Sequence, residues 1–101
     1  MALGLKTVTS TMGYQQITNV SSAVNLTVPT QNVEGLNQHP MIAIIVAEGA
    51  SVRYRDDGVA PTASVGMPLA AGVAFTFDGD MARIKFIEQT AGAKLNITYY
   101  A

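Results

Sequence analysis

Residues 94–100 read Lys-Leu-Asn-Ile-Thr-Tyr-Tyr, with apolar side chains at Leu95, Ile97 and Tyr99 and polar ones between them. Successive side chains of a β-strand point to opposite faces, so this period of two indicates a strand with one buried face. The same alternation recurs at residues 24–28, 52–55, 73–77 and 83–86. The sequence therefore predicts a protein built from short strands.

Residues 41–47, Met-Ile-Ala-Ile-Ile-Val-Ala, differ because they are apolar at every position. A strand that is buried on both faces reads as a continuous hydrophobic run instead of an alternating one. We interpret this segment as a central strand covered on both faces, either by two sheets or by one sheet and a partner.

Glycine and proline divide the rest of the chain into short segments. Asp78-Gly79 lies between two alternating runs and predicts a tight hairpin, because Gly accepts the positive φ of such a turn. A helix of a dozen residues has no place, and only the loop around residues 33–36 could hold a helical turn. We predict one all-β domain over residues 1–101, a β-sandwich or jelly-roll-like small barrel of about eight short antiparallel strands. Residues 1–12 are interpreted as an extended arm or an edge strand.

Two packed sheets would bury the apolar residues of the alternating segments and of residues 41–47. The predicted core consists of Val24, Leu26, Ile42, Ile44, Val46, Val52, Phe75, Phe77, Ile84, Phe86, Leu95 and Ile97.

Composition excludes several classes of function. Charged residues make up 13% of the chain, about half the usual share, and the net charge is −1. A surface so short of charge suits contact with other protein molecules. The chain has no excess of Lys and Arg to neutralise phosphates, so we expect no nucleic-acid partner. The apolar run at 41–47 is far below the ~20 residues of a membrane-spanning helix, so we expect no membrane association.

Residues suited to catalysis are few. The chain has one histidine, His39, and no cysteine, so a conventional zinc site is excluded. We interpret His39 as a loop residue, and a small hydrolase centred on it is the alternative. Asp56-Asp57 and Asp78 with Asp80 lie beside glycines, where aspartate caps turns, and calcium binding is the alternative. We predict no catalytic residue, no metal and no cofactor.

The densest group of charges and aromatic rings is a candidate for an interface or for anchoring a loop. Arg53 and Arg55 share one face of a predicted strand, opposite Tyr54, and are followed by Asp56 and Asp57. The guanidinium groups could form an ion-pair network that holds the loop, a polar anchor at a subunit contact, or a phosphate site. Near the carboxyl end, Tyr100 offers a further amphipathic ring of the kind found at interfaces.

The second half of the chain also resembles a known group of proteins. Residues 52–58, Val-Arg-Tyr-Arg-Asp-Asp-Gly, precede residues 61–69, Pro-Thr-Ala-Ser-Val-Gly-Met-Pro-Leu, then Asp78-Gly79 and a last strand ending in Tyr99-Tyr100. This order resembles small virion structural proteins of tailed bacteriophages, in which V-R-Y/W-R-x-D-G precedes P-T-x-x-x-G-x-x-L, a hairpin and a final strand with terminal aromatic residues. The resemblance covers roughly the last 60 residues and implies a capsid decoration (cement) protein or another head-associated role. It carries over no catalytic residue.

We therefore expect a non-enzymatic phage structural protein that is made in the cytoplasm of the host bacterium and sits on the capsid surface of the virion. The resemblance implies the major capsid protein as partner, together with further copies of this chain. Decoration proteins commonly sit on capsid symmetry axes, which favours a homo-oligomer and, among these, a trimer. The alternative is a carbohydrate- or receptor-binding β-module of a head fibre or tail, with Tyr14, Tyr54 or Tyr100 stacking on sugar rings.

Overall fold

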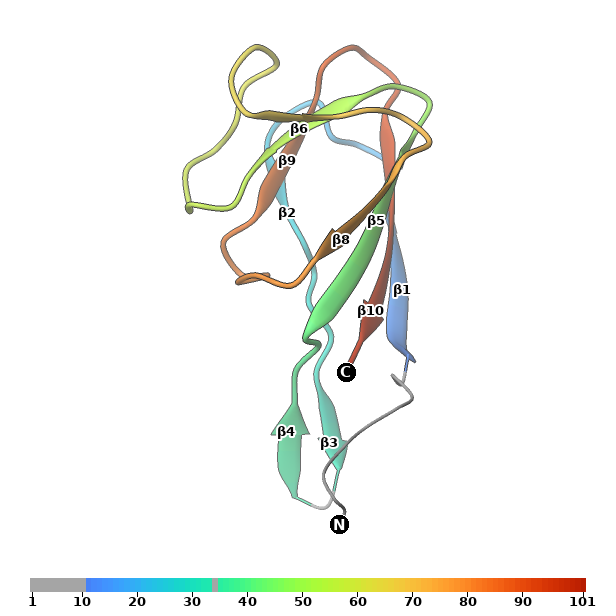
Figure 1. Ribbon diagram of the computed structural model, residues 1–101, viewed down its shortest axis with the longest axis vertical. Helices are drawn as coiled ribbons and strands as arrows, with labels where there is room; N and C mark the ends of the chain where they lie inside the picture. The colour runs from blue at the N-terminus through green and yellow to red at the C-terminus, as the bar shows by residue number, and fades with distance from the viewer. Residues whose placement is uncertain (1–10, 34) are drawn as a thin grey trace.

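The computed structural model describes residues 11–33 and 35–101, and within them it contains β-strands and no helix (Figure 1). Eight strands form two four-stranded antiparallel sheets, so the predicted all-β sandwich is confirmed. Sheet A has the order β1-β10-β5-β8, made of Thr11–Ile17 (β1), Lys94–Tyr100 (β10), Ile42–Glu48 (β5) and Ala74–Phe77 (β8). Sheet B has the order β2-β9-β6-β7, made of Val24–Asn25 (β2), Lys85–Glu88 (β9), Val52–Arg55 (β6) and Met67–Leu69 (β7).

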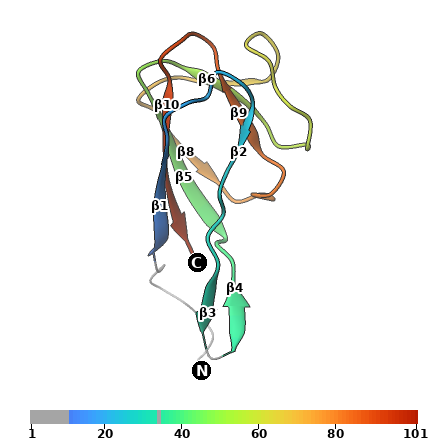
Figure 2. The same ribbon diagram turned by 180° about the vertical axis from the view of Figure 1, so that it is seen from behind.

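A separate hairpin projects beyond one end of the sandwich (Figures 1 and 2). It pairs Gln31–Val33 (β3) with Leu36–Gln38 (β4), and Val33 lies opposite Leu36. The loop around residues 33–36, the one place where a helical turn could fit, therefore joins two paired strands instead. Gly35 has a φ of 82°, which lets the chain reverse direction tightly enough for the two short strands to pair.

The predicted arm or edge strand at residues 1–12 is described only at its end. Thr11 and Met12 begin β1, which is an edge strand of sheet A. Residues 1–10 lie outside the described residues.

Sheet A is built on the pairing of β5 with β10, which places Ala43 opposite Tyr99 and Ile45 opposite Ile97. These four side chains are all buried between the sheets. Residues opposite each other in an antiparallel pair point to the same face, so the buried face of β10 determines the buried face of β5. Small Ala43 leaves room beside the large Tyr99 ring.

This register corrects part of the predicted core. Ile42, Ile44 and Val46 were expected to be buried, but they point away from sheet B and are only half-buried. Sequence alone could not choose between the two faces of β5, because both are apolar. The buried core consists of Val20, Leu26, Ala43, Ile45, Ala47, Val52, Leu69, Phe77, Met81, Ile84, Phe86, Ala93, Leu95, Ile97 and Tyr99, with Val24 and Phe75 packed partly buried against it.

The hairpin predicted at Asp78-Gly79 is also wrong, because the strands on either side belong to different sheets. β8 pairs with β5 in sheet A, whereas β9 pairs with β6 and β2 in sheet B. The connection crosses the end of the sandwich and buries Met81 on the way. Gly79 is required for space, because a Cβ there would lie 2.7 Å from the ring of Phe77.

One lateral side of the sandwich is sealed by the side chain of Gln15 on β1. Its Oε1 accepts a hydrogen bond from the Tyr99 hydroxyl at 2.7 Å and another from the backbone N–H of Thr27 at 3.2 Å. The first bond satisfies a buried hydroxyl, and the second ties β1 to the segment that follows β2. Since Tyr99 is 1% exposed, leaving its hydroxyl unpaired would be costly.

This arrangement predicts a loss of stability in alkali. Burial raises the pKa of Tyr99 from 10.0 to about 12. Between these two values the unfolded chain loses the phenolic proton while the folded chain keeps it, so the free energy of unfolding falls as the pH rises from 10 to 12. Below pH 10 the Tyr99 hydroxyl is protonated in both the folded and the unfolded chain, so it adds no pH dependence to the free energy of unfolding. Tyr99→Phe should flatten the profile in this window, whereas the exposed control Tyr14→Phe should not. Urea unfolding at a series of pH values measures both, and equal slopes in the two variants would contradict the assignment to Tyr99.

Candidate functional site

The side of sheet A that faces away from sheet B forms a continuous surface, which we call the outer face. The cross-strand registers place alternate residues of all four strands on it. They are Thr11, Tyr14, Gln16, Ile42, Ile44, Val46, Glu48, Ala74, Thr76, Lys94, Asn96, Thr98 and Tyr100. Only two of these residues are charged, Glu48 and Lys94, and they lie opposite each other at one end. The remainder of the face is apolar or uncharged polar.

The end of the outer face away from these charges is apolar. Ile42, Ile44, Thr76 and Tyr100 line a shallow hollow of about 260 Å³. Strand β5 contributes two of these side chains, which are among those expected in the core. Tyr100, a predicted interface residue, therefore lies on the outer face, on an interior strand of the sheet.

The opposite end of the outer face is held by hydrogen bonds around Asn96. Its Oδ1 accepts from the Tyr14 hydroxyl and from Gln16 Nε2, the latter at 3.0 Å. Its Nδ2 donates to Glu48 Oε1 at 2.8 Å. Because these groups satisfy one another, the polar end is an ordered surface in which Tyr14 stands 63% exposed.

The outer face has the composition of a protein interface. Sheet B covers the other side of β5, and within residues 11–33 and 35–101 no further strand layer covers the outer face. Half-exposed Ile and Val side chains on a sheet with few charges are typical of protein interfaces, which are depleted in charge at their centres. Residues 41–47 were expected to be covered on both faces, by two sheets or by one sheet and a partner. In the described residues one sheet, sheet B, covers one face of β5.

The predicted cluster at β6 holds a loop in place. Arg53 Nη1 donates to the carbonyl of Gly66 at 2.7 Å, and Arg53 Nε donates to the carbonyl of Ala63 at 3.1 Å. These bonds join β6 to the far end of the loop between β6 and β7. Gly66 is needed at this contact, because a Cβ there would lie 3.1 Å from the carbonyl oxygen of Tyr54.

The near end of the same loop is held by a second arginine. Arg55 Nε donates to Asp57 Oδ1 at 3.1 Å and forms the one salt bridge found among the described residues. The hydrogen bond from Arg55 is the main reason that the pKa of Asp57 is lowered. Arg83 donates to the backbone carbonyl of Asp57. Asp56, also a candidate site residue, is exposed beside this contact.

Tyr54 points into the sandwich, opposite in direction to Arg53 and Arg55. Its ring stacks on Phe75 with centroids 4.7 Å apart and is tilted against Phe86 at 6.0 Å. Burial and the nearby Asp56 carboxylate raise the pKa of the Tyr54 hydroxyl. The structure thus separates the three predicted aromatic contact residues, with Tyr54 inside and Tyr14 and Tyr100 on the outer face.

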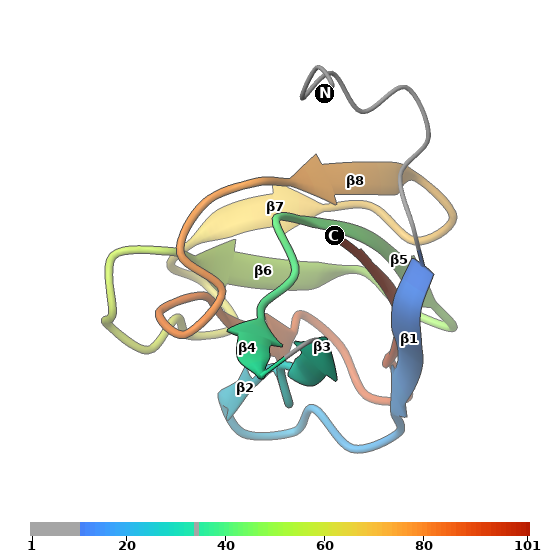
Figure 3. The ribbon, with the colours of Figure 1, turned by 90° about the horizontal axis from the view of Figure 1, so that it is seen from below.

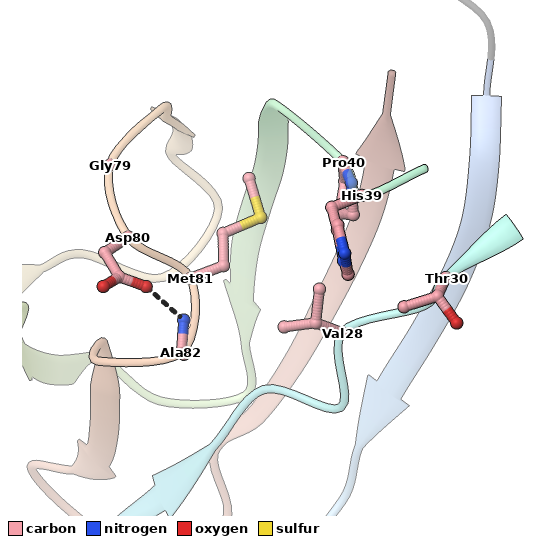
Figure 4. Close-up of a pocket in the computed structure, with 8 residues that line it drawn as sticks. All are labelled: Val28, Thr30, His39, Pro40, Gly79, Asp80, Met81 and Ala82. Carbon is pink, nitrogen blue, oxygen red and sulfur yellow. Dashed lines mark hydrogen bonds between the residues drawn. The ribbon is translucent and has the colours of Figure 1, made fainter. Parts of the chain in front are cut away.

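His39 lines a pocket of about 440 Å³ between the hairpin and the connection from β8 to β9 (Figure 4). Asp80 lines the same pocket, but its carboxylate accepts from the backbone N–H of Ala82 at 3.0 Å and caps the turn (Figure 4). The structure shows no hydrogen bond between Asp80 and the exposed His39. Across the described residues, no group of three His, Asp or Glu side chains is placed to hold a metal ion. The described part of the chain also has no helix long and apolar enough to cross a membrane.

Sequence reasoning missed the outer face as a unit. The signal was present in residues 41–47, whose apolar character on both sides indicated a second covered face. The other contributors, such as Thr76, Thr98 and Tyr14, are ordinary strand residues. They become neighbours only through the strand order β1-β10-β5-β8.

Replacing Arg53 should loosen the loop without unfolding the sandwich. Arg53→Ala removes the two bonds to the carbonyls of Ala63 and Gly66, so backbone amides of residues 58–66 should exchange with deuterium at least tenfold faster. Lys94→Ala is the control, because Lys94 is an exposed charged residue on β10, outside this loop. Hydrogen exchange read by mass spectrometry measures the difference, and equal rates in both variants would contradict the anchoring role of Arg53.

Comparison with known proteins adds no relative to these observations. No protein-family model matches the chain, and it has no match among curated proteins or solved structures.

Proposed function

We propose that this protein is a non-enzymatic structural component of a tailed-phage virion, a decoration protein that binds the major capsid protein and stabilises the head. The observation that carries the proposal is the outer face of sheet A, a four-stranded surface with charge at one end only. The virion protein pattern at residues 52–58 and 61–69 supports the phage context. In this proposal the protein acts on the capsid surface as a homo-oligomer, with a trimer favoured.

The loop pattern and the proposed function fit together physically. A decoration protein must present the same rigid surface at every repeated site on the capsid. Arg53 and Arg55 hold both ends of the loop between β6 and β7, and half of the specified positions of the virion pattern lie in this loop. A pre-ordered domain loses less conformational entropy when its outer face binds, so it binds more tightly for the same contact area.

A second candidate function, binding of a carbohydrate or receptor, has one observation in its favour. Exposed Tyr14 and half-buried Tyr100 share the outer face. Asn96 hydrogen-bonds to both the Tyr14 hydroxyl and the Glu48 carboxylate, so it links these two groups. However, Asn96 and Glu48 are already paired with each other, and the hollow lies at the apolar end of the face. A glycan array would decide, and binding that depends on Tyr14 would replace the decoration proposal.

A charge placed at the centre of the outer face should remove the protein from the capsid. Ile44→Asp would bury an unpaired carboxylate in the interface, so occupancy on purified particles should fall at least tenfold, which corresponds to about 1.4 kcal/mol. Val65→Asp is the matched control, because Val65 is 54% exposed on the loop between β6 and β7, outside the outer face. Gel densitometry of particles measures occupancy, and circular dichroism confirms that both variants fold.

Particles that lack the protein should also lose resistance to heat. If the protein is absent from purified particles, the proposed function is wrong. If the Ile44→Asp and Val65→Asp variants occupy the particles equally, the proposed contact surface is wrong.

A further inference from the structure

The two lateral sides of the sandwich differ in how they are closed. On the side of β1, Gln15 bonds to Tyr99 and to the backbone of Thr27, and a Cβ at Gly13 would lie 3.9 Å from the Pro29 ring. The segment after β2 therefore runs along β1 and covers the edge of sheet A there. The opposite side, where β7 and β8 lie next to each other (Figure 3), has no comparable seal among the described residues.

Apolar side chains remain exposed on that unsealed side. Met67 lies opposite Tyr54 in the β6–β7 pair, so it points toward the interior, yet it is 59% exposed. Val73, just before β8, is 53% exposed, and Phe75 is only partly buried against the Tyr54 ring. We call Met67, Val73 and Phe75 the open seam.

The edge of β8 beside the open seam lacks the protection found on the edges of sheet B. β7 carries Pro68, which has no backbone N–H to offer, and β2 has only two residues. Residues 73–77, Val-Ala-Phe-Thr-Phe, include no proline and no charge, and no described strand pairs with the outer side of β8. An unprotected edge of this kind is a template for strand addition.

A suitable occupant exists in the chain itself. Residues 1–10, Met-Ala-Leu-Gly-Leu-Lys-Thr-Val-Thr-Ser, precede β1 and place Leu3 and Leu5 two positions apart, so an extended segment would direct both leucines to one side. The only charged side chain among them is Lys6, whereas Asp78 and Asp80 follow β8 and form no salt bridge in the described structure. The side-chain charge of residues 1–10 is therefore opposite in sign to the charges that follow β8.

We propose that residues 1–10 of one copy add as a strand to the β8 edge of a second copy, with Leu3 and Leu5 covering the open seam. Ten extended residues reach about 33 Å, and pairing with residues 73–77 uses about 17 Å, so about 16 Å remains to bridge the two copies. This length is sufficient for neighbours in direct contact.

The donor segment and the acceptor edge lie on different parts of the molecule. β1, from which the donor segment extends, and β8, the acceptor, are the two opposite edges of sheet A (Figure 3). Such a contact can close reciprocally between two copies or run head-to-tail around a ring, and the trimer favoured in the proposed function corresponds to the ring. The inference rests on the homo-oligomer of the proposed function and gives a contact for its favoured trimer.

Cysteine cross-linking tests the contact directly, because the chain has no cysteine of its own. Full-length protein carrying Leu5→Cys and Val73→Cys should form covalent dimers and trimers under oxidising conditions, at least tenfold more than protein carrying Leu5→Cys and Val59→Cys. Val59 is 50% exposed, close to the 53% of Val73, but it lies in the loop after β6. If the only disulfide formed joins the two cysteines of one chain, the segment pairs within its own chain. If cross-linking is no greater than in the control, the segment does not pair with β8. Either result overturns the inference.

Mixing two variants tests the heterologous arrangement. Leu3→Asp/Leu5→Asp disables the donor and Val73→Asp disables the acceptor, so each variant alone should be monomeric by light scattering. An equimolar mixture retains one intact donor and one intact acceptor, and it should form a 1:1 dimer. Oligomers in either variant alone, or no dimer in the mixture of folded variants, overturn the inference.

Capsid occupancy separates this inference from the proposed function. If the Leu3→Asp/Leu5→Asp variant is monomeric but the wild-type protein is absent from particles, the arm contact stands and the decoration function fails. If cross-linking fails while wild-type protein occupies particles and Ile44→Asp does not, the function stands and the arm contact fails.

Discussion

The pairing of β5 with β10 is the constraint on which the rest of this structure depends. Leu95, Ile97 and Tyr99 alternate with polar residues, so β10 has only one face that can be buried. β5 is apolar on both faces and accepts whichever face its partner requires. Once Ala43 lies opposite Tyr99, the isoleucines at 42 and 44 must point outward. The same register that builds the core therefore also produces the apolar outer face.

The few charges of the chain act mainly at its loops. Arg53, Arg55 and Arg83 all bind backbone or side-chain groups of the loop between β6 and β7, and Asp80 caps the turn before β9. The outer face and the β8 edge are left nearly free of charge as a result. An uncharged sheet face and an unprotected edge both favour association with protein, which is the physical basis of the two proposed contacts.

Local patterns predicted strands well and connections poorly. Asp78-Gly79 has the composition of a tight hairpin, but Phe77 and Met81 are both buried at the end of the sandwich, and burying them requires the chain to cross to the other sheet. The turn sequence specifies a change of direction, whereas packing specifies which strand comes next. At residues 33–36, where the sequence left room for a helical turn, β3 pairs with β4 instead, since strand pairing is not visible in a short polar segment. Arg53 and Asp57 were identified as site residues from their spacing, but the loop carbonyls that Arg53 binds lie ten or more positions away in the sequence.

By itself the sequence determined that this protein is an all-β domain with one face of each alternating strand buried, because side-chain alternation is a property of the strand alone. It also determined that charge is scarce and that residues 53–57 concentrate much of it. Only the tertiary structure decided which face of β5 is covered and that β8 lies at an unprotected edge beside Met67 and Val73. These features depend on strand order and register, which arise from contacts between residues far apart in the chain and so leave no local signal.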